Sequence, residues 1–202
     1  MSRPSRRKTY DEPVMRPQMR NTSAREETII TQILDLLRTM RWPQKNPQRD
    51  RTRSKVLQTA NATIAAFALG KVRRYDLPGK LVQSQYNAKH PELYTLLKQL
   101  MQEHDPTFKY NAIQLNKNVK TKPHFDNNNL GPSYCLGIGT YRGGGLTLFP
   151  PDGPAYTLEN RHKWVLYDGA RLRHGSASVQ SGTRFAVVYY QSTPTRRSPK
   201  PS

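Results

Sequence analysis

The sequence predicts an α+β protein of the sandwich or jelly-roll kind, with its helices placed before its strands. Two observations support this prediction. Amphipathic segments with helical spacing occupy the first half of the 202-residue chain. From Tyr110 onward, short runs rich in β-branched and aromatic residues alternate with clusters of glycine, proline and asparagine, which is typical of many short strands. The length suits one domain with a sizeable core.

The first helix is expected to begin after Ser23, because Ser23 and Glu26 form a capping-box pattern. Apolar residues then recur at helical spacing until Pro43 stops the run. A second helix is expected to have Pro91 at its first position and to end at Asp105. The apolar stripes of both helices are interpreted as core-facing surfaces.

The segments outside these helices divide into loops and strands. Residues 42–55 are polar and basic and are expected to form a loop, whereas residues 62–74 fit a strand or a short helix. Six strands are expected, over residues 110–116, 133–140, 145–149, 155–159, 163–168 and 183–191.

The charge of the chain predicts a polyanionic partner. The formal net charge is +19, from 33 Lys and Arg against 14 Asp and Glu, which favours nucleic acid, DNA or RNA, over a merely solubilising surface. More than half of this excess lies near the ends, with net +8 in residues 1–55 and net +3 in residues 191–202. The composition of the ends predicts a flexible basic arm over 1–21, a single domain over 22–192 and a flexible basic tail over 193–202. Such arms bind phosphates non-specifically or act as a nuclear localisation signal.

Several classes of protein are excluded. Cys135 is the one cysteine of the sequence, which excludes a disulfide framework and argues against a cysteine-based zinc site. Cys135 is expected to be an inert buried thiol. No run of 18 apolar residues exists and the charged N-terminus is followed by no apolar stretch, so we expect an intracellular monomer with no membrane span. The glycines at 143–145 are not a phosphate loop, because neither Lys-Ser/Thr nor a helix follows them.

The triplet His124-Phe125-Asp126 is the sharpest chemical feature of the sequence. Residues i and i+2 of a strand point to the same side, so His124 and Asp126 would reach a common point. His174 is the best candidate for a third ligand. Two histidines and one carboxylate on one face of a metal are the arrangement of non-haem Fe(II) oxygenases. In the alternative interpretation, His124 and Asp126 are turn residues beside an asparagine run.

Arg184 lies in the last predicted strand among small and apolar neighbours, which indicates a partly buried cation in need of an anionic partner. A guanidinium can hold a carboxylate through two parallel hydrogen bonds. The partner is either the carboxylate of a cosubstrate or Asp168 in a structural ion pair.

The other histidines are expected to have structural roles. His162 lies between two basic residues and is expected on the surface. His90 and His104 stand at helix ends and are expected to act as caps or dipole partners. Trp164 and Phe149 are expected in the core rather than as base-stacking platforms.

Over about residues 110–191 the chain resembles the Fe(II)/2-oxoglutarate dioxygenase superfamily. The string HFDNNNLGPSYCLGIGTYRGGGL is most similar to the TET/JBP branch, which oxidises the methyl group of thymine or 5-methylcytosine. Prolyl-hydroxylase-like members share the YxGGxL segment but usually have a lysine where this chain has Arg184. The matching motifs are, in order, YNAIQLN, Pro123-His124-Phe125-Asp126, Tyr141-Arg142-Gly143-Gly144-Gly145-Leu146, Trp164-Val165-Leu166-Tyr167-Asp168-Gly169, His174 and Arg184.

The resemblance implies a double-stranded β-helix core over about residues 110–191, with the N-terminal helices packed on its outer face. It implies Fe(II) and 2-oxoglutarate as cofactors, with ascorbate as an alternative reductant. His124, Asp126 and His174 would be the iron ligands, and Arg184 the anchor for 2-oxoglutarate. Secondary candidates are Asn116 for the cosubstrate, Asn129 for the loop after the ligands, and Tyr141 and Arg142 for the substrate.

The predicted function is oxidation of a C–H group, in the first place the methyl group of a modified pyrimidine in nucleic acid. Larger nucleic-acid members of the superfamily have additional loops or domains that bind a duplex, and at this length those are expected to be reduced or absent. Single strands are therefore a candidate substrate. The chain could also be one domain excised from a larger polyprotein. One alternative is a hydroxylase of protein side chains, of the prolyl or lysyl type. Another is a catalytically silent nucleic-acid-binding module with the same fold, against which the intact triad argues.

Overall fold

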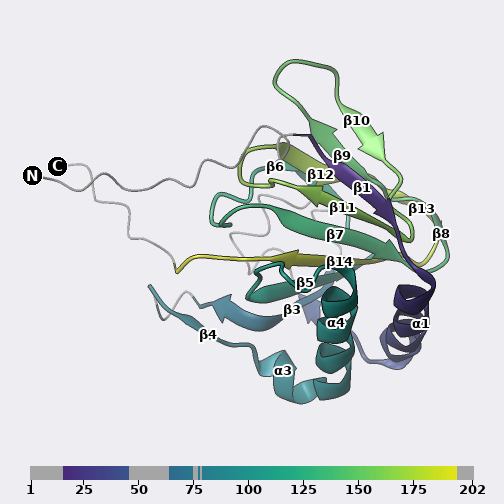
Figure 1. Ribbon diagram of the computed structural model, residues 1–202, viewed down its shortest axis with the longest axis vertical. Helices are drawn as coiled ribbons and strands as arrows, with labels where there is room; N and C mark the ends of the chain where they lie inside the picture. The colour runs from purple at the N-terminus through teal and green to yellow at the C-terminus, as the bar shows by residue number, and fades with distance from the viewer. Residues whose placement is uncertain (1–15, 46–63, 75–76, 78, 195–202) are drawn as a thin grey trace, which may run out of the picture.

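The computed structural model describes residues 16–45, 64–74, 77 and 79–194. Two facing layers of antiparallel strands form its centre, and helices cover one side (Figure 1). The helices of the described residues are α1 (Ala24–Thr39), α3 (Gln85–Lys89) and α4 (Pro91–His104). Within these residues, none of the helices combines the length and the apolar character needed to cross a bilayer.

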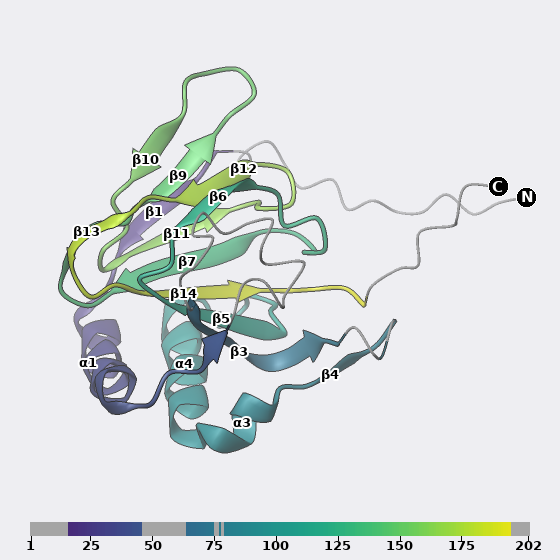
Figure 2. The ribbon, with the colours of Figure 1, turned by 180° about the vertical axis from the view of Figure 1, so that it is seen from behind.

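The larger sheet has the strand order β1-β11-β7-β14-β5-β3-β2, with β4 paired to β3. The smaller sheet has the order β10-β9-β12-β6, and β8 pairs with β13. Seen from behind, in Figure 2, the helices lie on the side of the larger sheet that faces away from the smaller one. This is the double-stranded β-helix, or jelly roll, with helices on its outer face. The strands are β1 (Gln18–Asn21), β2 (Gln44–Lys45), β3 (Ile64–Arg73), β4 (Leu81–Gln83), β5 (Ala112–Lys117), β6 (Thr121–His124), β7 (Ser133–Ile138), β8 (Tyr141–Gly143), β9 (Leu146–Phe149), β10 (Tyr156–Leu158), β11 (Lys163–Tyr167), β12 (Arg173–Ser176), β13 (Val179–Gly182) and β14 (Phe185–Tyr190).

Both predicted helices are confirmed. Ser23 caps α1, with the reciprocal bonds between Ser23 and Glu26 that define a capping box. Pro91 opens α4, and the helix ends at His104, one residue before Asp105. The six predicted strands correspond to β5, β7, β9, β10, β11 and β14, and the ambiguous stretch 62–74 contains the long strand β3.

The structure differs from the sequence prediction at the chain ends. Gln18–Asn21, placed in the flexible arm, instead form the edge strand β1, which pairs with β11 from Gln18 opposite Leu166 onward. These residues are exposed and polar, so composition carried no sign of a strand that is held by backbone hydrogen bonds. Gln44–Lys45 likewise form β2 within the predicted loop 42–55. Trp42, also placed in that loop, is buried in the core and donates through Nε1 to the Leu37 carbonyl at 2.8 Å. Residues 1–15 of the predicted arm, 46–55 of the predicted loop and 195–202 of the predicted tail lie outside the described residues.

Two apolar cores result from this layering. The larger core lies between the main sheet and helices α1 and α4, and Trp164 is buried in it, as predicted. The smaller core lies between the two sheets and contains only six buried residues among those described: Cys135, Leu146, Leu148, Val165, Tyr167 and Leu172. The rest of the space between the sheets is therefore available to polar side chains.

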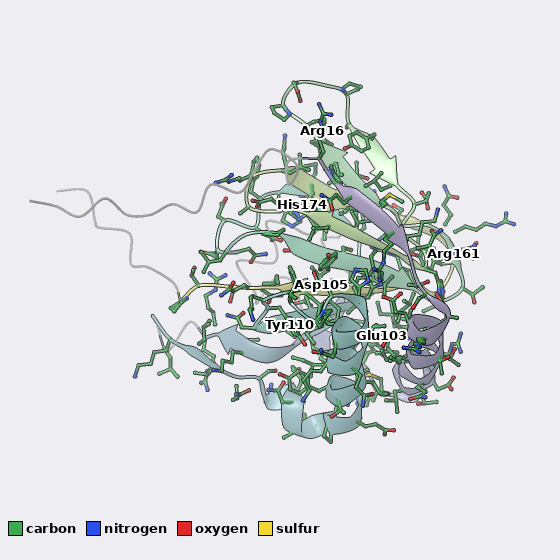
Figure 3. The ribbon with its side chains drawn as sticks, viewed as in Figure 1. Arg16, Glu103, Asp105, Tyr110, Arg161 and His174 are labelled. Atoms are coloured by element: carbon green, nitrogen blue, oxygen red, sulfur yellow. The ribbon has the colours of Figure 1, made fainter. Side chains whose placement is uncertain are left out.

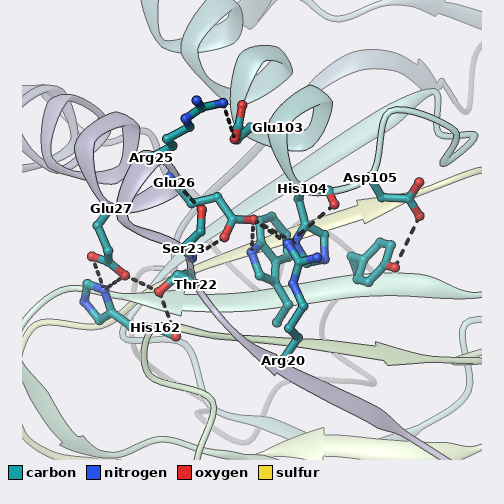
Figure 4. A network of polar contacts seen from close by, with 12 residues as sticks. Arg20, Thr22, Ser23, Arg25, Glu26, Glu27, Glu103, His104, Asp105 and His162 are labelled. Carbon is teal, nitrogen blue, oxygen red and sulfur yellow. Dashed lines mark hydrogen bonds and ion pairs between the residues drawn. The ribbon is translucent and has the colours of Figure 1, made fainter.

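A buried carboxylate joins the N-terminal elements to the sheet (Figure 4). Glu26 is fully buried and accepts hydrogen bonds from Arg20 Nη2 and Trp164 Nε1, both at 3.1 Å. His104 Nδ1 lies 2.7 Å from Glu26 Oε1, so His104 is a buried partner of the first helix rather than a simple cap or dipole partner. Burial alone would raise the pKa of Glu26, but the hydrogen bonds from Ser23 and His104 outweigh it and lower that pKa. The carboxylate is thus ionised at neutral pH.

Candidate active site

The structure brings His124, Asp126 and His174 together between the two sheets. His124 and His174 are directly opposite residues of the paired strands β6 and β12, and their ring centroids are 4.4 Å apart. Asp126 lies between them, with Oδ2 3.5 Å from His174 Nε2 and Oδ1 3.7 Å from His124 Nε2. One ligand atom from each residue lies within 4.8 Å of the others, so the three side chains could hold one metal ion. In Figure 3, His174 lies among the strands on the side away from the helices.

Asp126 reaches the cluster by a route that differs from the sequence argument. Strand β6 ends at His124, so Asp126 is not in the strand but begins the loop after it. The Asp126 backbone N–H donates to the Gly169 carbonyl at 2.8 Å, which ties this loop to the segment before β12. A Cβ on Gly169 would lie 3.0 Å from His174 Cε1 and 3.2 Å from Asp126 Oδ2, so glycine allows the close approach of both ligands.

Backbone carbonyls set the tautomer of both histidines. His124 Nδ1 lies 2.8 Å from the Lys122 carbonyl, and His174 Nδ1 lies 3.0 Å from the Leu172 carbonyl. A carbonyl can only accept, so each Nδ1 carries the proton and each Nε2 presents a lone pair to the cluster. This is the arrangement that orients histidine toward a metal.

The protonation states of the cluster suit a cation. Burial, and then the neighbouring His174, lower the pKa of His124, so His124 is neutral near pH 7. Burial alone would raise the pKa of Asp126, but contacts with His174 and the charges of His124 and Arg73 outweigh it and lower that pKa. An ionised carboxylate and a neutral imidazole are the forms that bind a divalent metal, and a set of two nitrogens and one oxygen suits Fe(II).

A second polar group lies deeper in the barrel. Arg184 immediately precedes β14 and shares the face of Val188, which packs into the smaller core, so its side chain enters the space between the sheets. It is 3% exposed, and its Nε has no hydrogen-bond partner among the described residues. Asp168, the alternative partner, is instead 3.8 Å from Arg171 Nε.

Tyr141 accompanies Arg184. The Tyr141 side chain is 5% exposed, and its hydroxyl also lacks a partner within the described part of the chain. Burial raises the pKa of Tyr141 to about 12, with the nearby Arg184 charge opposing part of the rise, so the phenol remains a donor at neutral pH. Two buried donors without acceptors indicate a carboxylate-binding site.

Glycines provide the room for these two side chains. A Cβ on Gly144 would lie 2.8 Å from Arg184 Cδ, and a Cβ on Gly137 would lie 2.1 Å from the Tyr141 hydroxyl. Gly144 also has a φ of +72°, which a side chain would strain. The glycine run at 143–145 therefore has a steric role here.

Two asparagines near the candidate site were not predicted from the sequence. Asn118, in the left-handed region with φ of +51°, accepts from the Arg184 backbone N–H through Oδ1 at 2.7 Å and donates its own N–H to the Arg184 carbonyl at 2.9 Å. Asn160 is buried, donates through Nδ2 to Cys135 Sγ at 3.4 Å, and leaves Oδ1 without a partner among the described residues. No local motif marks either residue, because each role depends on strands brought together by the fold.

The secondary candidates occupy different places. Asn116 is half-buried on β5 and accepts from Gln114 Nε2 at 3.1 Å. Asn129 Nδ2 lies 3.4 Å from Asp126 Oδ2, which suits a role in organising the loop after the ligands. Tyr141 lies inside beside Arg184, whereas Arg142 is exposed on β8 opposite Ser181.

A jelly roll that brings two histidines and a carboxylate together has the ligand set of the non-haem iron oxygenases. No protein-family model matches the chain, and no curated protein sequence matches it. Solved structures with the same fold do exist, and the chain has the fold of the 2OG-Fe(II) oxygenases.

Three such structures are similar over most of the chain. An oxidoreductase of the 2OG-Fe(II) oxygenase family from Burkholderia pseudomallei matches 90% of this chain and 89% of its own length, with TM-score 0.57 and 16% identity. NgTET1 in complex with 5mC DNA matches 90% and 74%, with TM-score 0.56 and 11% identity. A prolyl hydroxylase from Trichoplax adhaerens, in complex with a hypoxia inducible factor peptide fragment, matches 89% and 85%, with TM-score 0.56 and 11% identity. At such identities the likeness shows the fold alone, and it does not single out the TET/JBP branch.

Proposed function

We propose that the protein is an Fe(II)- and 2-oxoglutarate-dependent oxygenase that oxidises a C–H group, in the first place the methyl group of a modified pyrimidine in nucleic acid. One observation carries the oxygenase part: a metal-type triad and an orphaned, buried Arg184–Tyr141 pair share the interior of one barrel. The triad suits Fe(II), and the pair suits the distal carboxylate of a 2-oxo-dicarboxylic acid.

Each residue has a defined task in this proposal. His124, Asp126 and His174 would hold the metal on one face and leave its other face open. The bound metal would supply the oxidising chemistry together with O₂ and 2-oxoglutarate. Arg184 would pair with the cosubstrate carboxylate, and Tyr141 would donate a second hydrogen bond to it. The apolar walls of the smaller core would keep bulk water from this carboxylate.

Nucleic acid is favoured as substrate by charge. Between residues 106 and 151 the sequence contains five Lys and Arg, and Asp126 is the one acidic residue of that stretch. The similar NgTET1 structure is a complex with 5mC DNA. Hydroxylation of a protein side chain is the second candidate, since the prolyl hydroxylase with a bound peptide is equally similar in fold. The buried Arg184, whose Nε has no partner among the described residues, argues against a catalytically silent module. The proposal does not include ascorbate as the reductant, because the Arg184–Tyr141 pair suits the carboxylate of the oxo-acid.

Anaerobic titration tests the oxygenase proposal. Fe(II) with 2-oxoglutarate should produce a weak visible charge-transfer band that is lost in His124→Ala and Asp126→Ala. His162→Ala is the matched control, because this half-exposed histidine contacts Glu27 at 2.8 Å, away from the triad, and should keep the band. No band with the unaltered chain would overturn the metal assignment. Mass spectrometry of DNA, RNA and peptide pools after incubation would then identify the substrate class.

A further inference from the structure

Two exposed apolar side chains flank the metal-type cluster. Phe125 is 45% exposed and Leu130 is 48% exposed, and they lie on either side of Asp126 in the loop between β6 and β7. Large apolar side chains grouped beside a site usually mark a binding surface, because water exposure of their area is unfavourable. A contact surface on the loop that carries Asp126, called the entrance below, is therefore indicated.

Backbone hydrogen bonds hold this loop in one shape. Asp126 donates to the Gly169 carbonyl at 2.8 Å, Asn129 donates to the Asp126 carbonyl at 2.8 Å, and Leu130 donates to the Gln191 carbonyl at 2.7 Å. Phe125 and Leu130 are thus presented by a turn that is anchored on both sides. A preformed surface binds at a lower cost in conformational entropy than a loose one.

Cationic side chains occur on the segments next to this loop. Lys122 is exposed on β6, two residues before His124, and Arg171 is exposed in the segment that also supplies the Gly169 carbonyl. Arg73 ends β3, and its charge acts on Asp126. In both views the end of β3 lies at the same end of the molecule as the loop between β6 and β7 (Figures 1 and 2). The entrance therefore combines two exposed apolar side chains with cations on neighbouring segments.

We propose that this entrance, formed by Phe125, Leu130, Arg73, Lys122 and Arg171, binds a single nucleic-acid strand. An unpaired base would stack on Phe125, and the three cations would contact phosphates on either side. Aromatic platforms set among cations are the general means of binding single strands, and a duplex would hide the base faces that stacking requires. The proposal rests on the proposed function, since the stacked base would lie next to the base offered to the metal.

Binding of a fluorescent 12-nucleotide single strand to the full chain tests this surface by anisotropy. Phe125→Ala should weaken binding about 5- to 100-fold, the range of base–aromatic stacking. Tyr156→Ala is the matched control: Tyr156 is 42% exposed, but it lies on β10 at the far edge of the smaller sheet. Equal affinities of the two variants would overturn the proposal. The basic ends of the chain are present in both variants, so their contribution cancels.

The salt dependence of binding separates phosphate contacts from stacking. Arg73→Gln should reduce the slope of log affinity against log salt by about one, as should Lys122→Gln. Lys98→Gln, on the exposed face of α4, should leave the slope unchanged. A duplex of the same sequence that binds more tightly, or a proline-containing peptide that competes for the Phe125 surface, would contradict the single-strand assignment.

The failure of this surface and the failure of the oxygenase proposal give different results. His124→Ala should lose the charge-transfer band and still bind the strand, whereas Phe125→Ala should keep the band and lose affinity for the strand. A missing band combined with strand binding that depends on Phe125 would refute the oxygenase and support the surface. A normal band combined with strand binding that is insensitive to Phe125 would refute the surface alone.

Discussion

Replacement of Glu26 by alanine should strongly destabilise the fold, because one buried carboxylate joins β1, α1, α4 and β11 (Figure 4). Its removal would leave the buried Trp164 Nε1 without an acceptor and His104 Nδ1 with Arg20 Nη2, at 2.7 Å, as its remaining contact, and the Ser23 N–H would lose one side of its capping box. Arg20 is more than half exposed and can turn to water, so it adds little to the loss.

The expected loss is about 3–5 kcal/mol, the range for breaking a buried charged network by removing one partner. Urea unfolding followed by tryptophan fluorescence measures it. Glu103→Ala is the control: Glu103 lies 3.9 Å from the exposed Arg25, so a change within about 0.5 kcal/mol is expected. A loss below about 1 kcal/mol in Glu26→Ala would refute the view that this carboxylate holds the N-terminal elements to the sheet.

Three further predictions concern pH and the cosubstrate site. Burial lowers the pKa of His104 below its ordinary value of 6.5. The contribution of neutral His104 to stability is therefore complete above pH 6.5 and is lost as the pH falls through the lower pKa of the folded state. Urea midpoints should decline between pH 7.5 and pH 5, and less steeply in His104→Asn. Asn118→Ala should weaken 2-oxoglutarate binding about 5-fold, because Arg184 loses a contact that holds it in place, while iron affinity is kept. Asn118→Gly removes the same amide but tolerates the positive φ, so it separates the loss of the amide from backbone strain. Equal 2-oxoglutarate affinities of Asn118→Ala and the unaltered chain, in titrations of the visible band, would contradict this prediction. Gly144→Ala should weaken 2-oxoglutarate binding at least 10-fold, on the order of 1.4 kcal/mol, because its Cβ meets Arg184, while Gly79→Ala, with a similar φ and nothing within 4 Å, should not.

The parts of the fold that the sequence predicts are those with strong local patterns. The capping box at Ser23 and the proline at Pro91 mark helix starts because capping depends on residues within one turn. Strands such as β14 are visible because they are buried and rich in valine and tyrosine. β1 was missed because an exposed edge strand is held through its backbone, which leaves no mark on side-chain composition.

Neither of the two strands that carry the histidines is among the six predicted strands, although the argument for His124 and Asp126 assumed a strand at that position. β6 reads TKPH, in which Thr121 is the one β-branched residue and a proline follows it closely, and β12 reads RHGS, which has neither a β-branched nor an aromatic hydrophobic residue. Their sequences follow the needs of the cluster: histidine for the ligand and glycine where β12 passes close to β6. A Cβ on Gly175 would lie 3.0 Å from the Thr121 carbonyl oxygen. Residue type therefore pointed to the cluster of His124, Asp126 and His174, although the secondary structure around it could not be predicted in full.

The interior of the barrel explains why residue type indicated the candidate site better than strand propensity did. A barrel filled with apolar side chains would be more stable, since orphaned polar atoms such as Arg184 Nε and the Tyr141 hydroxyl carry a desolvation cost of about 1–3 kcal/mol each. Glycine at 137 and 144 keeps open the space that larger side chains would fill. Unpartnered polar atoms and unfilled space at the same place both lower stability, which favours a ligand-binding role for this part of the interior. A carboxylate bound there would supply the missing hydrogen bonds. The same argument explains why Arg184 stood out in the sequence: a cation directly before a buried strand rich in alanine and valine conflicts with packing unless an anion completes it.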